Sequence, residues 1–178
     1  FIQLCNQIDV PLLFLHNITG FLVGTDFEQN GITKNGSKMI NAVSNSTVPH
    51  ISVIVGASYG AGNYGMSGRA FGPRFTFIWP TAKIAVMGPK QMAGVMTIVQ
   101  RSATERRGEV FDEAANDKRV EAVEHWAEER SKGLYATSRI SDDGMIDPRD
   151  TRTVIGIALS ACHNRAVAGT KEYGTWRM

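Results

Sequence analysis

Short apolar runs alternate along this chain with longer segments in which apolar positions recur at helical spacing. Residues 31–47 show the helical spacing at Ile32, Met39 and Val43, and Pro49 ends that helix. The runs with the length and residue types of buried strands are 10–15, 51–55, 75–79 and 84–87. This alternation of strands and helices predicts an α/β fold.

Other segments connect or extend these elements. Residues 1–7 read as the last turns of an amphipathic helix without an N-terminal cap, so we expect the chain to begin inside a larger protein. We further expect a loop over 16–24, a close-packed short helix over 61–70, a helix opened by Pro89, an amphipathic surface helix over 105–132, a turn-rich loop over 141–148 and a final helix over 149–165.

Composition narrows the function classes. With 178 residues, of which 43% are apolar, the chain can bury the core of one globular domain. Its 19 basic and 17 acidic residues give a net charge of +2, too balanced to predict a nucleic-acid surface. No apolar run of 18 residues is present, which excludes a membrane-spanning helix within this sequence.

Cysteines and histidines give no metal prediction. The two cysteines cannot build a disulfide framework or a metal cluster, and we expect both Cys5 and Cys162 to be small buried hydrophobes. The four histidines show no i,i+4 pairing of the kind found in zinc sites. We therefore assign no metal to this chain.

A run of small residues, 56–66 (GASYGAGNYGM), follows the apolar segment 51–55 and is the strongest candidate for chemistry. Glycine lets a ligand approach the main chain, and the first turn of a helix leaves N–H donors free. The run could hold a phosphate, stabilise an enolate or ureido oxygen, or only let a helix pack closely on a sheet. It lacks the Gly-Lys-Ser/Thr ending of a P-loop, which disfavours the phosphate. Ala61 and Gly62 are the candidate donors to an oxyanion.

Five motifs in order give the chain a family resemblance. They are Asn17-Ile-Thr-Gly-Phe21, Lys34-Asn-Gly-Ser-Lys-Met-Ile-Asn-Ala-Val43, Gly60-Ala-Gly-Asn-Tyr-Gly-Met66, Trp79-Pro and Asp142-Asp-Gly-Met-Ile-Asp-Pro-Arg-Asp-Thr-Arg152, and Gly174-Thr-Trp-Arg-Met178 closes the match. Together they resemble the carboxyltransferase (beta) subunits of biotin-dependent acyl-CoA carboxylases, and most of all the methylcrotonoyl-CoA type.

This resemblance implies a crotonase-like fold, a spiral of ββα units with projecting helices that pack onto a partner subunit. Residues 1–178 would be the C-terminal carboxyltransferase domain, which receives carboxybiotin, without its own beginning and without the preceding CoA-binding domain. The implied activity is that of a carbon–carbon bond-forming ligase that carboxylates an acyl-CoA. The implied partners are a biotin carboxylase and biotin carrier (alpha) subunit and further beta subunits, in a hexamer built from dimers. The implied compartment is the bacterial cytoplasm or the mitochondrial matrix.

The resemblance also assigns roles to individual residues. The N–H groups of Ala61 and Gly62 would form the oxyanion hole on the biotin side, and Gly60 would supply the bend. Propionyl-type relatives have Gly-Gly-Ala at these three positions, which could shift the donor by one residue. Gly20 and Phe21 would face the same pocket, where Phe21 either covers biotin or packs in the core.

Two other features have plainer interpretations. We interpret Tyr64 as a buried tyrosine with a structural hydrogen bond rather than as a wall of the acyl pocket. The carboxylates of Asp142, Asp143 and Asp147 are flanked by turn residues, and we interpret them as turn and capping groups rather than as catalysts.

Alternatives remain open at this point. A saturated acyl-CoA, propionyl or long-chain, is the second choice of substrate. A crotonase-type enoyl-CoA hydratase or isomerase would use the same backbone donors but needs a carboxylate near the glycine run, and no acidic residue lies between Glu28 and Glu105. A fragment without its CoA-binding domain could also act only in assembly.

Overall fold

A five-stranded parallel sheet organises the computed structural model, which describes residues 1–174. The last four residues of the closing motif therefore lie outside the described part of the chain. The strands are β1 (Leu12–Ile18), β2 (His50–Tyr59), β3 (Phe75–Ile78), β4 (Lys83–Ala85) and β5 (Gly144–Met145). They run in the order β1-β2-β3-β5, while β4 pairs in parallel with the carboxyl-terminal end of β2.

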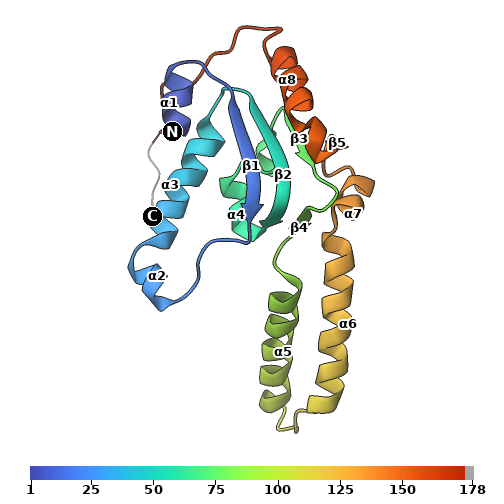
Figure 1. The fold of residues 1–178 in the computed structure, drawn as a ribbon. Helices are drawn as coiled ribbons and strands as arrows, with labels where there is room; N and C mark the ends of the chain where they lie inside the picture. The colour runs from blue at the N-terminus through green and yellow to red at the C-terminus, as the bar shows by residue number, and fades with distance from the viewer. Residues whose placement is uncertain (175–178) are drawn as a thin grey trace.

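Helices cover both faces of the sheet, and two of them leave it as a hairpin (Figure 1). The α-helices are α1 (Ile2–Gln7), α2 (Thr25–Gln29), α3 (Ile32–Asn45), α4 (Gly60–Gly65), α5 (Pro89–Arg106), α6 (Glu113–Ser131), α7 (Gly133–Ser138) and α8 (Thr151–Cys162). Short 3-10 turns follow α4 as η1 (Arg69–Phe71) and precede α8 as η2 (Pro148–Asp150). No helix among the described residues is long and apolar enough to cross a membrane.

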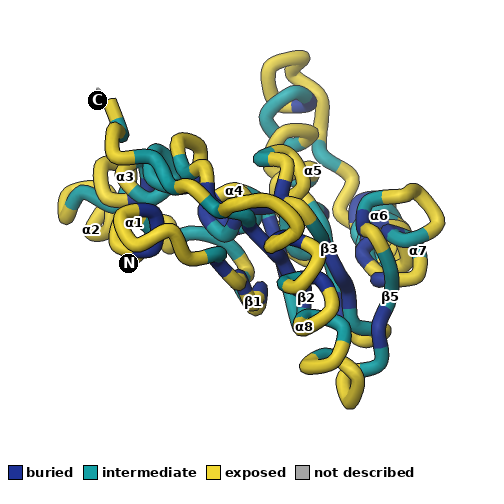
Figure 2. Tube along the Cα trace, turned by 90° about the horizontal axis from the view of Figure 1, so that it is seen from above, coloured by how far each residue is buried: buried dark blue, intermediate teal, exposed yellow. Residues whose placement is uncertain are grey.

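The core lies in layers on the two sides of β2, whose trace is buried along most of its length (Figure 2). On one side, Ile51 and Val53 pack with Ala158 of α8. On the other side of the sheet, residues of β1 pack with α1 and α3 in a cluster of Cys5, Leu12, Phe14, Val43 and Val48. Full burial of one such aliphatic side chain stabilises the fold by roughly 1.5–3 kcal/mol.

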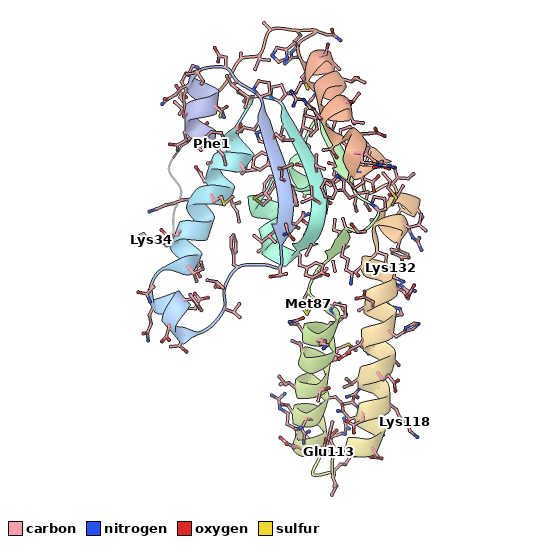
Figure 3. All side chains as sticks on the ribbon, viewed as in Figure 1. Phe1, Lys34, Met87, Glu113, Lys118 and Lys132 are labelled. Atoms are coloured by element: carbon pink, nitrogen blue, oxygen red, sulfur yellow. The ribbon has the colours of Figure 1, made fainter. Side chains whose placement is uncertain are left out.

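The α5–α6 hairpin projects from the sheet, with Met87 and Lys132 at its base and Glu113 near its tip (Figure 3). Arg101 of α5 holds Glu113 of α6 through two hydrogen bonds of 2.7 and 3.0 Å and lies 4.3 Å over the ring of Phe111. At the base, Lys83 of β4 forms an ion pair with Glu128 of α6. Side-chain contacts therefore hold α5 against α6 and hold α6 against β4.

The sequence pattern placed the main elements correctly. The helix expected over 31–47 is α3, the terminal helical turns are α1, and the strands at 75–79 and 84–87 correspond to β3 and β4. The α/β architecture is confirmed, as is the burial of both cysteines. The short elements α2, α7 and β5 had no predicted counterpart.

The single helix expected over 105–132 is wrong. Gly108, with φ of 70°, ends the first helix, and Asp112 caps the second by accepting the Ala115 N–H at 3.0 Å. Val110, counted as part of an apolar face, lies in the connecting turn and is 94% exposed. The exposed character of α6 agrees with the surface-helix interpretation.

The final helix is also shorter than expected. It was predicted over 149–165, but Pro148–Asp150 form η2, and α8 covers Thr151–Cys162.

Candidate functional site

The candidate site is the turn where β2 leads into α4, which we call the donor turn (Gly60–Gly62). Tyr59 is the last extended residue, and Ala61 and Gly62 lie in the first turn of the helix. Within the described part of the chain, neither the Ala61 N–H nor the Gly62 N–H has a hydrogen-bond acceptor. Such free donors at the start of a helix are suited to an anionic or polarised oxygen.

Two glycines of the donor turn leave no room for side chains. Gly60 has φ of 53°, in the left-handed region, and a Cβ atom there would lie 2.8 Å from the Val86 carbonyl oxygen. A Cβ atom on Gly62 would lie 2.9 Å from Cδ1 and Cγ1 of Ile18. The main chain of the turn is therefore packed between β1 and the segment that leads from β4 into α5.

The glycine run begins to turn later than its sequence suggested. Residues 56–59 continue β2, because Ala57, Ser58 and Tyr59 pair with β4. Gly56 sits at a register shift between β1 and β2, where a Cβ atom would be 2.3 Å from Oδ1 of Asn17. That oxygen accepts the Ala57 N–H at 3.3 Å. The lack of a side chain at Gly56 thus lets the Asn17 side chain, rather than a ligand, approach the main chain.

Strand β1 is longer than expected because its end also pairs with the last residues of β2. Residues 16–18, predicted as the start of a loop, extend β1 and pair with β2 across this shift.

Gly20 and Phe21 lie in the loop after β1. A Cβ atom added to Gly65, at the far end of α4, would lie 3.5 Å from the Phe21 ring, and one added to Gly36 would lie 3.3 Å from it. Phe21 also lines a cavity of about 290 Å³ between this loop and α3. Gly20 has φ of 127° and open space around its Cβ position. These contacts favour packing for Phe21, and its place beside Gly65, at the opposite end of α4 from Ala61, leaves the biotin-covering role a prediction.

The interpretation of Tyr64 as a buried tyrosine is wrong. The residue is 48% exposed, because it lies on the outer side of the short α4 helix. Its ring meets Phe71 edge-on, with the two centroids 5.7 Å apart. Tyr64 is therefore available to a neighbouring molecule.

The aspartates of the 141–148 loop make structural contacts. Oδ2 of Asp143 accepts the Thr76 N–H at 2.7 Å and pairs with Arg69 at 2.8 Å, which fastens the loop to β3 and η1. The other two have local donors: the Thr137 hydroxyl for Asp142 and the Arg149 N–H for Asp147, both at 2.8 Å. The hydrogen bonds from Arg149 hold the pKa of Asp147 below its ordinary value. Within residues 1–174, no group of three or more His, Cys, Asp or Glu side chains could hold a metal ion.

Behind the donor turn lies a hydrogen-bonded chain of three polar side chains, two of them buried, that the sequence analysis missed. Asn63 Nδ2 donates to Ser58 Oγ at 2.9 Å, and Ser58 Oγ lies 2.9 Å from Nδ1 of His16. His16 and Ser58 are fully buried. Burial lowers the pKa of His16 to about 4, and the nearby Met66 backbone opposes this shift only in part. The three residues come from β1, β2 and α4, so only the paired sheet brings them together.

A second buried histidine supports the opposite end of β2. His50 lies 2.8 Å from the hydroxyls of both Ser67 and Ser46, and burial lowers its pKa to about 4. It fastens the segment after α4 to the end of α3. Both rings are thus neutral at physiological pH and stabilise the fold through their hydrogen bonds.

With this geometry in view, the comparisons with known proteins identify the family. A family model described as "Carboxyl transferase domain" matches residues 1–174. The chain belongs to the carboxyl transferase domain family. The α/β fold of this member is therefore a carboxyltransferase fold.

Curated relatives agree with this assignment. A Mycobacterium tuberculosis protein described as a probable biotin-dependent acyl-coenzyme A carboxylase beta2 subunit is 58% identical over the whole chain, which spans 34% of that protein. A mitochondrial methylcrotonoyl-CoA carboxylase beta chain of Arabidopsis thaliana is 50% identical over the whole chain, which spans 30% of it. The chain thus covers about a third of the length of these relatives.

Solved structures share the fold. The beta subunit of Pseudomonas aeruginosa geranyl-CoA carboxylase superposes with a TM-score of 0.84 at 43% identity, over 99% of this chain and 34% of that one. A crystal structure of transcarboxylase 12S, described as a hexamer assembly with methylmalonyl-coenzyme A and methylmalonic acid bound, gives a TM-score of 0.79 at 31% identity. It is matched over 98% of this chain and 32% of that one. The crotonase-like carboxyltransferase architecture is thereby shown for this part of the molecule.

Proposed function

We propose that the protein is the carboxyltransferase subunit of a biotin-dependent acyl-CoA carboxylase, which transfers a carboxyl group from carboxybiotin to an acyl-CoA. The observation that carries this proposal is that the Ala61 and Gly62 N–H groups have no acceptor within residues 1–174, in a chain that belongs to the carboxyl transferase domain family. Backbone donors of this kind can stabilise an oxygen on which negative charge develops.

The donor turn fits the ureido group of biotin. The ureido oxygen would accept from the Ala61 and Gly62 N–H groups, which donate to no acceptor among residues 1–174. When bound, biotin supplies the carboxyl group and a ring nitrogen that can take up the substrate proton. Removal of one donor from an oxyanion hole typically lowers the rate by about 10²–10³.

This chain contributes orientation and charge stabilisation rather than a titrating side chain. Among the described residues, no carboxylate forms a hydrogen bond with any residue of 56–66. A hydratase or isomerase would need a positioned acid or base at this point. The absence of such a contact favours carboxyl transfer over the hydratase or isomerase alternative.

Other domains and subunits of the enzyme would bind the CoA thioester and carry biotin. We propose that residues 1–178 form the C-terminal domain of a longer beta chain, whose preceding domain binds the CoA thioester. The outer face of α5 exposes apolar side chains that suit contact with another subunit: Val95, Met96, Ile98 and Val99. We propose a hexamer built from dimers, in line with the hexamer assembly described for transcarboxylase 12S. Biotin would be carried by a partner alpha subunit.

For the substrate, we propose a branched, unsaturated acyl-CoA of the methylcrotonoyl kind. Support comes from the Arabidopsis methylcrotonoyl-CoA carboxylase chain and from the geranyl-CoA carboxylase structure. A saturated acyl-CoA is the second candidate, since transcarboxylase 12S binds methylmalonyl-coenzyme A. The proposed compartment is the bacterial cytoplasm or the mitochondrial matrix, because one of the two relatives described above is bacterial and the other is described as mitochondrial.

Streptavidin capture from a native extract tests this function. The captured material is probed for this chain and then supplied with ATP, labelled bicarbonate and a panel of acyl-CoAs. We expect co-capture and ATP-dependent labelling of methylcrotonoyl-CoA above propionyl-CoA. If the chain stays in the flow-through and no acyl-CoA becomes labelled, the proposal is wrong.

A further inference from the structure

The donor turn has little side-chain anchorage of its own. Its three residues are Gly60, Ala61 and Gly62, and Ala61 is exposed. Glycine loses more conformational freedom on ordering than any other residue, so a Gly-Ala-Gly turn needs external support to keep one geometry. Ser58 lies before the turn and Asn63 lies after it, and a hydrogen bond joins their side chains.

These two side chains close a clamp across the turn. An amide nitrogen can only donate, so Asn63 Nδ2 donates and Ser58 Oγ accepts, over 2.9 Å. The Ser58 hydroxyl then has its own proton free for Nδ1 of His16, at 2.9 Å. This order assigns the His16 proton to Nε2, on the side of the Met66 backbone at the other end of α4. The two hydrogen bonds thus link β1, β2 and α4 through Ser58, whereas the buried Nε2 of His16 has no hydrogen-bond partner among residues 1–174.

Burial makes the clamp rigid. His16 and Ser58 have no exposed surface, so a broken hydrogen bond cannot be replaced by one to bulk water. The bonds that join Asn63, Ser58 and Nδ1 of His16 therefore hold these three side chains in one arrangement. His16 itself is fixed by β1, whose register with β2 places it across from Ile54.

We propose that His16, Ser58 and Asn63 are positioning residues that hold the donor turn so that the N–H groups of Ala61 and Gly62 point at one oxygen. The proposal rests on the proposed carboxyltransferase function, because it gives the clamp a role in that reaction. None of the three residues touches the reacting atoms in this account. They act through the backbone between Ser58 and Asn63.

Hydrogen exchange in the full-length beta chain, bound to its biotin-bearing partner, tests the clamp without reference to activity. The reporter is the Met66 amide, which donates to the Gly62 carbonyl at 3.1 Å. In Ser58→Ala we expect this amide to exchange at least about tenfold faster, since helix openings that the clamp suppresses become frequent. The matched control is Ser131→Ala, which removes an equally buried hydroxyl whose bond to Glu128 lies in α6. Exchange of Met66 should change less than twofold in the control.

Steady-state kinetics of the same complexes test the role in the reaction. Loss of the clamp should lower kcat about tenfold while KM for acyl-CoA and bicarbonate stays within twofold, because the substrates bind elsewhere. The control should keep its kcat. Asn63→Ala, at a partly exposed position, should repeat both effects and serves if Ser58→Ala does not fold.

The outcomes separate the two proposals. Unchanged Met66 exchange in the clamp variants overturns the positioning role, and so does faster exchange with normal kcat. A wild-type complex that carboxylates no acyl-CoA overturns the proposed function, whereas the exchange comparison still decides whether the clamp holds the turn.

Discussion

Replacement of Gly60 by alanine is the perturbation that bears most directly on the donor turn, and the fold supplies a matched control at Gly72. Both glycines have left-handed backbone, with φ of 53° and 61°. They differ in what a new methyl group meets. At Gly60 it would lie 2.8 Å from the Val86 carbonyl oxygen, whereas at Gly72 nothing lies within 4 Å. Alanine at either position therefore has the same cost of left-handed backbone, and only alanine at Gly60 also meets a backbone atom.

The expected magnitudes follow from that difference. A left-handed alanine costs roughly 1–2 kcal/mol at either site. At Gly60, either the turn or the Val86 peptide must also move, and such overpacking typically adds about 1–3 kcal/mol. Movement of the turn misaligns the donors, for which a fall in kcat of about 10²–10³ is typical. Gly72→Ala should lose only the roughly 1–2 kcal/mol of a left-handed alanine and keep kcat within about twofold.

Urea unfolding of each full-length variant measures the stability loss, and ATP-dependent bicarbonate fixation by the assembled complex measures kcat. Gly60→Ala is expected to assemble and to be nearly inactive. Equal activity of the two alanine variants would refute the reasoning, because the Val86 contact would then have no bearing on the chemistry. Equal stability losses would show that the turn can move away at no cost.

Three further predictions address other parts of the account. Gly62→Val should abolish carboxyl transfer while size-exclusion chromatography shows an intact assembly, because the crowding is local to the turn; normal turnover would remove the turn from the mechanism. Asp143→Asn keeps an acceptor for the Thr76 N–H but loses its charge, so urea unfolding should show about 1 kcal/mol less stability with unchanged kcat, and a stable but inactive variant would contradict us. Burial lowers the pKa of His16 and His50 from 6.5 to about 4, so the unfolded chain binds more protons between these values. Stability measured by urea unfolding should therefore be full above about pH 6.5 and fall toward pH 4, by up to roughly 1.4 kcal/mol per pH unit for each ring, whereas a flat profile would mean that the rings are not buried as described.

The elements that could be predicted are those with a strong local pattern. The helix α3 and the apolar starts of the strands follow directly from residue spacing, and the donor turn was found because glycines follow an apolar run. The end of β2 could not be found in this way. Its last residues are small, and they stay extended because β4 pairs with them rather than because of their own side chains.

The hairpin tip and the clamp show two different limits. The tip was missed although Gly108 and Asp112 carry ordinary stop and start signals, because the mixed charges around them resemble one long surface helix. The clamp has no local signal at all. His16 and Ser58 are 42 positions apart and meet only when β1 pairs with β2. Contacts of this kind depend on register, which a pattern of hydrophobic positions does not give.

The most direct test of the central claim is a cryo-EM structure of the full-length beta chain in complex with its biotin-bearing partner. The quantity to measure is the distance from the biotin ureido oxygen to the backbone nitrogens of Ala61 and Gly62. We predict both distances at about 2.7–3.1 Å, the range of an oxyanion hole. A biotin bound in this domain with its ureido oxygen turned away from both nitrogens, or held by side chains instead, would contradict the account.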